Sequence, residues 1–333
     1  MAIKVGINGF GRIGRNVFRA IVESGTKEIE VVGINDLSSI DQLAHLFKFD
    51  SIHGRFQGDV SVSGEHLVVN SHKPIVSAVR EPENLPWQNV DIALECTGIF
   101  TSRNAAARHL QNGSSKVIVS APCTDADKTI VFGVNHQILE NGDQVISNAS
   151  CTTNCLSPVV KVINDAIGIN RGFMTTIHSY TGDQPTLDAI HKDPYRARAA
   201  AMSMIPTTTG AARAVGLVLP ELKGKLDGVA IRVPTPNVSV VDFKFESSRI
   251  TSPEEINESI RTAAEGALNG ILGYTDQPNV SIDFNHDNHS SIFHMDQTRV
   301  MDGTFCRILS WYDNEWGFSN RMIDVTLELG KTI

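Results

Sequence analysis

Residues 3–14 read Ile-Lys-Val-Gly-Ile-Asn-Gly-Phe-Gly-Arg-Ile-Gly, and this stretch decides the fold of the N-terminal half. Its first part, residues 3–8, predicts a buried strand, and the apolar periodicity of residues 15–22 predicts a helix. The G-x-G-x-x-G motif at residues 9–14 is typical of a dinucleotide-binding turn when a strand precedes it and a helix follows. Its glycines let the backbone approach a pyrophosphate, whose charge then lies at the helix N-terminus. A glycine-rich turn without a ligand is the weaker interpretation, because strand, motif and helix stand in register.

A second predicted strand, residues 29–35, is followed by an acidic residue. Asp36 stands 22 residues beyond Gly14, where a carboxylate accepts hydrogen bonds from the adenosine ribose. A carboxylate at this place also repels the extra 2′-phosphate of NADP, so the sequence favours NAD as the cofactor. One residue does not settle that preference.

Further strands are predicted at residues 90–96 and 116–120, and both end in small polar residues. Small groups at the carboxyl ends of parallel strands leave room for a ligand that lies across the sheet. Strands that alternate with helices predict an α/β, doubly wound Rossmann nucleotide-binding domain over residues 1–150. A helix predicted at residues 316–329 is interpreted as returning to this domain, which residues 316–333 would complete.

The remaining stretch, residues 151–315, has a different pattern. A helix is predicted at residues 254–266, with Ser252 as its N-cap and Pro253 as its first helical residue. Several strands are grouped apart from the helices, at residues 171–178, 229–233, 238–245 and 305–311. Such grouping predicts an α+β domain with a mostly antiparallel sheet.

Composition argues against several classes of function. The formal net charge of −8 disfavours non-specific nucleic-acid binding, which needs a basic face. No run of about eighteen apolar residues occurs, so no membrane span is predicted. Residues 1–6 carry a lysine and a glycine where a signal peptide needs an apolar stretch, so a cytoplasmic location is expected.

The cysteines and histidines give no sign of a disulfide framework or a metal site. There are five cysteines, and an odd count in a chain without a secretory signal argues against paired disulfides. The best metal candidate is the run His-Asp-Asn-His at residues 286–289. Because a third and a fourth ligand are missing there, no metal is predicted.

A second informative stretch is Ser150-Cys151-Thr152-Thr153-Asn154-Cys155. It follows a strand-like run at residues 144–147 and precedes a helix predicted at residues 156–167. A cysteine at a helix start lies at the positive end of the helix dipole, which favours the nucleophilic thiolate. From its position alone, Cys151 is equally well explained as a reactive thiol or as an inert buried one.

The segment from residue 180 to residue 205 is long, polar and rich in arginine, and it lacks a clean periodicity. Loops of this length in compact domains are usually functional or take part in a subunit contact. A disordered excursion is the alternative, and the apolar side chains of Ile190, Tyr195, Met202 and Met204 argue against it.

With the Ser150–Cys155 stretch, the chain closely resembles one particular family, the phosphorylating glyceraldehyde-3-phosphate dehydrogenases of the bacterial type. The matching segments span nearly the whole chain in the family's order. They are Ile-Asn-Gly-Phe-Gly-Arg-Ile-Gly-Arg at 7–15, His-Ser-Tyr-Thr at 178–181, Pro-Thr-Thr-Thr-Gly-Ala at 206–211, Arg-Val-Pro-Thr-Pro-Asn-Val-Ser at 232–239 and Trp-Tyr-Asp-Asn-Glu-Trp-Gly at 311–317.

The resemblance implies a mechanism and a set of site residues. Cys151 would be the nucleophile toward D-glyceraldehyde 3-phosphate, and His178 would be its base, so that residues 151–315 form the catalytic domain. Inorganic phosphate would then attack the resulting thioester. The implied phosphate-binding residues are Thr181 and Arg232 for the substrate, Ser150, Thr152, Thr209 and Gly210 for the attacking phosphate, and Arg196 near both. The implied cofactor contacts for NAD are Gly9, Phe10, Gly11, Arg12, Ile13, Asp36, Arg80, Thr97, Phe100, Ser120 and Asn314.

The resemblance also implies a homotetramer, with the 180–205 segment close to a neighbouring subunit. Some positions depart from the commoner bacterial pattern: Gly182, the pair Ala189-Ile190 and the pair Pro194-Tyr195. These departures bear on cofactor stringency and subunit contacts rather than on the chemistry. Cys155 is interpreted as a packing residue with possible redox sensitivity.

Two other functions remain open from the sequence. Erythrose-4-phosphate dehydrogenase shares the Ser-Cys-Thr-Thr-Asn core, although residues 232–237 and 207–210 favour the glyceraldehyde enzyme. A redox-sensing or moonlighting protein that binds NAD is the alternative from a different class. The presence of Cys151, His178 and Arg232 argues against a protein that has lost catalysis.

Overall fold

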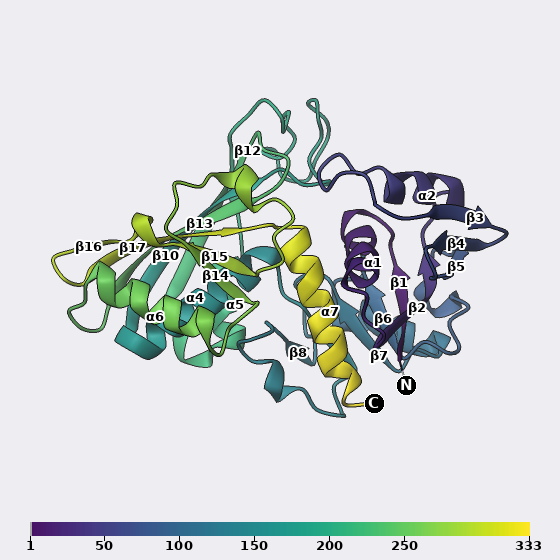
Figure 1. Ribbon diagram of the computed structural model, residues 1–333, viewed down its shortest axis with the longest axis horizontal. Coiled ribbons are helices and arrows are strands. Elements are labelled where there is room, and N and C mark those ends of the chain that lie inside the picture. Colours follow the sequence, from purple (N-terminus) through teal and green to yellow (C-terminus); the bar gives the residue numbers. More distant parts are fainter. Residues whose placement is uncertain (1) are drawn as a thin grey trace. The chain divides into compact units, whose positions relative to one another are not determined.

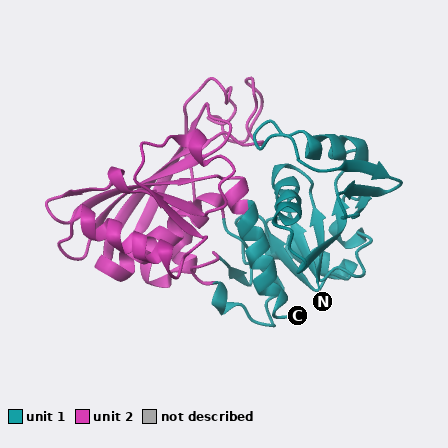
Figure 2. Ribbon diagram, in the orientation of Figure 1, with its two compact units in different colours: residues 1–130, 136–149, 319–333 teal, residues 131–135, 150–318 magenta. Residues whose placement is uncertain are grey.

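The structure is a computed structural model that describes residues 2–333. The chain forms two compact units (Figure 2). The first unit comprises the described residues up to 130 together with 136–149 and 319–333, and the second comprises 131–135 and 150–318. Each unit is built around its own sheet, as the two separate groups of arrows in Figure 1 show.

The first unit contains a nine-stranded sheet in the order β3-β4-β5-β2-β1-β6-β7-β9-β8. Its centre consists of parallel strands, and β1 pairs with both β2 and β6. Chain order therefore reverses between β1 and β6, which is the place where doubly wound sheets bind ligands. The strands are β1 (Ile3–Asn8), β2 (Ile29–Asn35), β3 (Val60–Ser63), β4 (His66–Val69), β5 (Ile75–Ser77), β6 (Ile92–Glu95), β7 (Lys116–Val119), β8 (Lys128–Thr129) and β9 (Val145–Ser147).

Three α-helices and three short 3₁₀ helices accompany this sheet. The helix after β1 begins at Arg12, inside the glycine motif and three residues earlier than the sequence predicted. The second half of the motif, residues 12–14, is therefore part of the helix. It ends at Gly25, which adopts the left-handed conformation (φ 64°) that glycine tolerates best. These helices are α1 (Arg12–Ser24), α2 (Ile40–Lys48), α3 (Arg103–Ala106), η1 (Pro82–Asn84), η2 (Ala107–Asn112) and η3 (His136–Ile138).

The C-terminal helix α7 (Trp316–Gly330) ends in the first unit. Gly330 approaches Ile3 so closely that a Cβ on it would lie 2.2 Å from the Ile3 side chain. The Lys116 ammonium donates a hydrogen bond of 2.6 Å to the hydroxyl of Thr332. Both ends of the described chain thus pack on the same sheet.

The second unit contains an eight-stranded mixed sheet. Two pairings are parallel, β10 with β12 and β14 with β15, and the other five are antiparallel. Its strands are β10 (Ile169–Ser179), β11 (Ile205–Thr208), β12 (Leu226–Val233), β13 (Ser239–Ser247), β14 (Leu272–Thr275), β15 (Ser291–His294), β16 (Arg299–Met301) and β17 (Phe305–Tyr312). The predicted fold class, a Rossmann domain followed by an α+β domain with a mostly antiparallel sheet, is confirmed.

One helix of the second unit is buried along much of its length. This helix, α4 (Cys151–Ile167), packs against β15 and β17, and its first turn is capped by the Ser150 hydroxyl, which accepts from the Thr153 N–H. Its apolar side chains, such as Val159 and Ile163, are 0–1% exposed. The unit also contains α5 (Ala211–Val218), α6 (Pro253–Glu265), η4 (Pro220–Leu222), η5 (Ser281–Phe284) and η6 (Met295–Gln297).

Between β10 and β11 the chain runs from residue 180 to residue 204 without helix or strand. Several large apolar side chains there are exposed, among them Ile190 and Met202. Across residues 2–333, no helix combines the length and apolar character needed to cross a membrane.

Candidate active site

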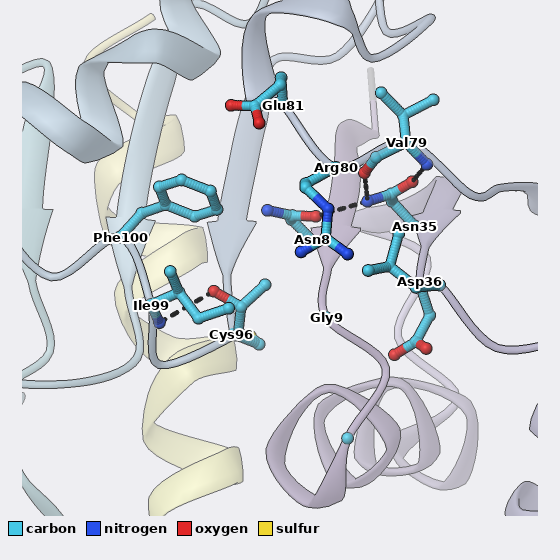
Figure 3. Close-up of a pocket in the computed structure, with 13 residues that line it drawn as sticks. Asn8, Gly9, Asn35, Asp36, Val79, Arg80, Glu81, Cys96, Ile99 and Phe100 are labelled. Atoms are coloured by element: carbon cyan, nitrogen blue, oxygen red, sulfur yellow. Dashed lines mark hydrogen bonds between the residues drawn. The ribbon is translucent and has the colours of Figure 1, made fainter.

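A cavity of about 450 Å³ opens at the carboxyl ends of β1, β2 and β6 (Figure 3). This is the predicted side of the sheet for a dinucleotide. Six of the predicted cofactor residues line it: Gly9, Gly11, Asp36, Arg80, Thr97 and Phe100. The sequence interpretation missed the other lining residues: Asn8, Asn35, Leu37, Val79, Glu81, Cys96 and Ile99.

The glycine turn at the start of α1 has the shape that a pyrophosphate needs. Gly9 has φ +89°, and a Cβ on Gly14 would lie 2.0 Å from the Gly9 carbonyl oxygen, so neither position accepts a side chain. Nothing lies within 4 Å of the corresponding point on Gly11, so the backbone there is open to a ligand. The first turn of α1 has no side-chain cap and no acidic residue. Its N–H groups and positive dipole end therefore suit an anion.

Asp36 lies at the carboxyl end of β2 and connects two parts of the cavity wall. Its carboxylate accepts from the N–H of Phe10, at 2.9 Å, and from the N–H of Ser38, also at 2.9 Å. The carboxylate is thereby fixed beside the glycine turn. The predicted contact of this carboxylate with a ribose hydroxyl stays a prediction.

Other predicted cofactor residues do not line the cavity. Phe10 is fully buried in the core, and Ser120 uses its N–H to bond the Glu95 carbonyl at 3.0 Å. Arg12 forms an ion pair of 2.5 Å with Asp50. Although burial opposes it, this pairing and backbone hydrogen bonds lower the pKa of Asp50 to about 2. Ile13 follows Arg12 in the first turn of α1 and is half-buried.

In the second unit, Cys151 and His178 form a pair. Cys151 is the first residue of α4, and His178 lies near the end of β10. The distance from Cys151 Sγ to His178 Nε2 is 3.6 Å. His178 Nδ1 lies 2.7 Å from the Ser179 carbonyl oxygen. A carbonyl only accepts, so Nδ1 carries the hydrogen and Nε2 presents its lone pair to the thiol.

The pKa shifts of the two side chains favour a neutral resting pair. Burial raises the pKa of the Cys151 thiol, and the opposing effects of Arg232 and the Thr152 N–H do not outweigh it. Burial, reinforced by the charge of Arg232, lowers the pKa of His178 to about 3. Burial thus favours the uncharged form of both side chains.

A cationic cluster adjoins this pair. One guanidinium nitrogen of Arg232 donates to the carbonyl of Ser179 and to the hydroxyl of Thr181, at 3.0 Å each. Arg196 donates to the carboxylate of Asp183 at 3.1 Å, and Thr181 also bonds that carboxylate. An anion of the substrate would meet two guanidinium groups and a hydroxyl here.

The residues predicted around the attacking phosphate have structural partners of their own. Ser150 caps α4, and the Thr152 hydroxyl lies 2.8 Å from that of Tyr312. Thr209 and Gly210 precede α5, and the Thr209 hydroxyl accepts from the Ala211 N–H at 3.1 Å. The Thr153 hydroxyl donates to the Ala211 carbonyl at 3.3 Å, which joins the starts of α4 and α5.

Asn314 and Cys155 occupy different environments from each other. The amide oxygen of Asn314 accepts from the hydroxyls of Ser179 and Ser239, at 2.8 Å each, which fixes the orientation of its amide group. Cys155 is completely buried with its sulfur 3.3 Å from the Ser291 hydroxyl, and burial raises its pKa to about 12.

The histidines at 286–289 have partners other than a metal. His286 stacks on Trp316 with ring centroids 3.7 Å apart, and His289 Nδ1 lies 2.7 Å from the Asp287 carboxylate. Within residues 2–333, no group of three or more potential ligands is arranged to hold a metal ion.

Comparison with known proteins settles the family. Residues 3–103 match the family model described as glyceraldehyde 3-phosphate dehydrogenase, NAD binding domain, and residues 150–314 match the one described as its C-terminal domain. The chain belongs to the glyceraldehyde-3-phosphate dehydrogenase family. It is thus an NAD-dependent oxidoreductase that acts on aldehydes, and the cavity in its first unit lies in the family's NAD-binding domain.

Similar glyceraldehyde-3-phosphate dehydrogenases occur in several bacteria. The chain is 67% identical over 334 residues to one from Cereibacter sphaeroides, with all of both chains covered. It is 68% identical to one from Xanthobacter flavus, with 99% of each covered. It is 57% identical to one from Geobacillus stearothermophilus, with 98% of this chain and 97% of the relative covered.

Proposed function

We propose that the chain catalyses the NAD-dependent oxidation and phosphorylation of D-glyceraldehyde 3-phosphate to 1,3-bisphosphoglycerate. The observation that carries this proposal is the Cys151–His178 pair, because its tautomer leaves Nε2 ready to accept the thiol proton. The Arg232–Thr181 cluster adjoins the pair and suits the phosphate of the substrate.

The proposed reaction begins at the Cys151 sulfur. The thiol proton passes to His178 Nε2 as the sulfur–carbon bond to the aldehyde forms. The imidazolium then gives this proton to the carbonyl oxygen, which completes a hemithioacetal and leaves Nε2 free to accept again. NAD, when bound, accepts the hydride. As the hydride leaves the carbon, His178 accepts the hydroxyl proton and a thioester remains on Cys151. Inorganic phosphate then attacks the thioester carbon, the sulfur leaves as thiolate, and 1,3-bisphosphoglycerate is released.

We assign Thr181 and Arg232 to the substrate phosphate and Arg196 to both anions. Ser150, Thr152, Thr209 and Gly210 are assigned to the attacking phosphate, supported by the join between the starts of α4 and α5. Asn314 is assigned to the nicotinamide carboxamide, since its amide group is held in one orientation by Ser179 and Ser239. The remaining cofactor contacts are proposed as predicted, including Arg12, Ile13, Phe10 and Ser120.

At the level of the molecule, we propose a nucleotide-binding domain of residues 1–150 completed by 316–333, and a catalytic domain of residues 151–315. A homotetramer and a cytoplasmic location complete the proposal. Exposed apolar residues between 180 and 204 support an assembly that covers them.

The test is NADH formation from D-glyceraldehyde 3-phosphate with and without inorganic phosphate, run in parallel with NADP and with erythrose 4-phosphate. We expect turnover that requires phosphate and prefers NAD and the glyceraldehyde substrate. Turnover independent of phosphate, or a clear preference for erythrose 4-phosphate, would contradict the proposal. The named relatives support the glyceraldehyde substrate over the erythrose alternative.

A further inference from the structure

A buried acid–imidazole pair next to the cofactor cavity has no part in the reaction described above. Glu95 is the last residue of β6 and is 1% exposed, and His109 in η2 is 0% exposed. His109 Nε2 lies 2.9 Å from Glu95 Oε2. Ionisable side chains are rarely buried this completely without a partner or a role.

The Glu95 carboxylate is surrounded by donors. One oxygen accepts from the backbone N–H and the hydroxyl of Thr97. The other accepts from the Asn8 amide at 2.7 Å and faces His109 Nε2. On its other side His109 Nδ1 lies 3.5 Å from the side-chain nitrogen of Asn112, which can only donate, so Nε2 carries the ring hydrogen and points it at Glu95.

Two of the three hydrogen-bond partners of Glu95, Thr97 and Asn8, line the cofactor cavity. The Thr97 hydroxyl donates its hydrogen to Glu95 and accepts from the N–H of Ile99 at 3.0 Å. It therefore fixes the stretch of cavity wall that continues to Phe100. The side-chain oxygen Oδ1 of Asn8 accepts from Nδ2 of Asn35 at 2.8 Å.

From Asn35 the hydrogen bonds continue to the opposite wall. Asn35 Oδ1 accepts from the N–H of Val79, and Asn35 Nδ2 donates to the Val79 carbonyl, at 2.8 Å each. Val79 precedes Arg80, and both line the cavity. Figure 3 shows Asn8, Asn35 and Val79 joined in this way beside Arg80.

His109 has little freedom to move away from Glu95. The Trp87 ring stacks on it with centroids 5.8 Å apart and 12° between the planes. Trp87 is itself 2% exposed and is pressed against the backbone of Gly6 and Gly33, where a Cβ would lie 2.6–2.8 Å from the indole. The imidazole is therefore held in place by packing as well as by its hydrogen bond.

We propose that Glu95 and His109 are positioning residues for NAD, which act through Thr97 and Asn8 to hold both walls of the cavity in the shape that binds the cofactor. This inference rests on the proposed NAD-dependent function. We expect Glu95 and His109 to affect the affinity for NAD and to leave the chemical steps at Cys151 unchanged.

The experiment compares two substitutions of the histidine in the full chain. His109→Leu removes the donor, and we expect the dissociation constant and the KM for NAD to rise about tenfold while kcat at saturating NAD stays within about twofold. His109→Gln keeps an N–H for Glu95, and we expect it to restore the KM to within about threefold of the unaltered chain. Glu95→Gln, which turns an amide nitrogen toward donors, should match or exceed the loss in His109→Leu.

Asp127→Asn serves as the matched control. Asp127 pairs with Arg103 at 2.6 Å and accepts from the N–H groups of Gln144 and Val145, but it does not line the cavity. We expect this variant to lower the thermal unfolding temperature without changing the dissociation constant for NAD measured by calorimetry on folded protein.

Two results would overturn the inference. One is an unchanged dissociation constant in His109→Leu, and the other is a loss that is equal in His109→Leu and His109→Gln. If Glu95→Gln does not fold, the histidine pair alone decides. Failure of the proposed function would look different, because the unaltered chain would then form no product from D-glyceraldehyde 3-phosphate.

Discussion

Two cysteines one helical turn apart on α4 have opposite surroundings. Cys151 faces a histidine lone pair at 3.6 Å and lies within the field of Arg232. Cys155 has no exposure, and its sulfur lies near the hydroxyl of Ser291 and the carbonyls of Ser310 and Trp311. Residues four apart share one face of a helix, so the difference arises from position along α4: Cys151 begins the helix beside the end of β10, and Cys155 lies one turn further on, against β15 and β17.

This contrast gives a prediction for the two thiols. Cys151→Ser should reduce the turnover rate by about a thousandfold or more, because a neutral hydroxyl replaces the nucleophile. NAD affinity should remain within about twofold. Cys155→Ser should keep turnover within about threefold and change the unfolding temperature little, because the Ser291 hydroxyl and the carbonyls of Ser310 and Trp311 can hydrogen-bond the new hydroxyl. Initial rates, calorimetry and thermal unfolding measure these effects; full activity in Cys151→Ser would refute the assigned nucleophile.

The buried neutral imidazole predicts a dependence of stability on pH. The folded pKa of His178, about 3, lies below the ordinary 6.5, so the unfolded chain binds the extra proton between these values. The contribution of His178 is fully present above pH 6.5 and falls as the pH falls toward the folded pKa. From pH 6.5 to pH 5 the loss amounts to about 2 kcal/mol.

Urea unfolding at several pH values, with the chain compared against His178→Asn, measures this effect. We expect the stability difference between the two proteins to shrink by about 2 kcal/mol over that pH range. A difference that is constant with pH would show that His178 is not held neutral. Exchange of the exposed His66 for Asn is the control, and it should leave the pH dependence unchanged.

At the scale of single elements, two glycines at the start of α1 are expected to have different roles. Gly14 is needed for close packing, whereas Gly11 leaves the backbone open to a ligand. Gly14→Ala should destabilise the first unit by about 2 kcal/mol or more, because its Cβ would collide with the Gly9 carbonyl. Gly11→Ala meets open space in an extended conformation and should change stability by less than about 0.5 kcal/mol.

The same pair of substitutions tests the cofactor site. Gly11→Ala should nevertheless weaken NAD binding about tenfold or more, since its methyl group stands where the backbone is open to a ligand. Chemical unfolding and calorimetry on both variants check the two expectations. If Gly11→Ala binds NAD normally, the pyrophosphate does not approach this turn.

The elements that the sequence predicted well are those with strong periodicity or clear caps. The strands at 3–8 and 29–35 coincide with β1 and β2, and α6 begins at Pro253 behind Ser252 as expected. Short elements such as α2, with its N-cap Ser39, were missed because nine residues give little periodic signal.

Site residues that belong to a local sequence motif were predictable, whereas residues that only tertiary packing brings to the site were harder to predict. The glycine turn and Asp36 follow from local spacing. By contrast, Asn8 and Asn35 were interpreted only as strand ends, although paired asparagines at the ends of neighbouring parallel strands could have indicated a cavity wall. The neutral state of Cys151 and His178 depends on burial, which no local pattern reports.

At the scale of the whole molecule, the 180–204 segment tests the proposed tetramer. Ile190 is fully exposed in the single chain, and Leu187, Met202 and Met204 are more than 70% exposed. Ile190→Asp should therefore weaken assembly and shift the sedimentation distribution toward smaller species at micromolar concentration. Ile333→Asp, at another exposed apolar position, should leave the distribution unchanged. Identical distributions for Ile190→Asp and the unaltered chain would exclude Ile190 from the subunit contact.

The return of the C-terminal helix to the first sheet has a consequence for how the protein is made. Ile3, in β1, packs against Gly330, and the Lys116 side chain donates a hydrogen bond to Thr332. All nine strands of this sheet precede α7 in the chain, so they are synthesised well before the helix that packs against Ile3. We therefore expect this face of the sheet to stay uncovered until α7 has been made, which couples the final packing of the first unit to the synthesis of the second.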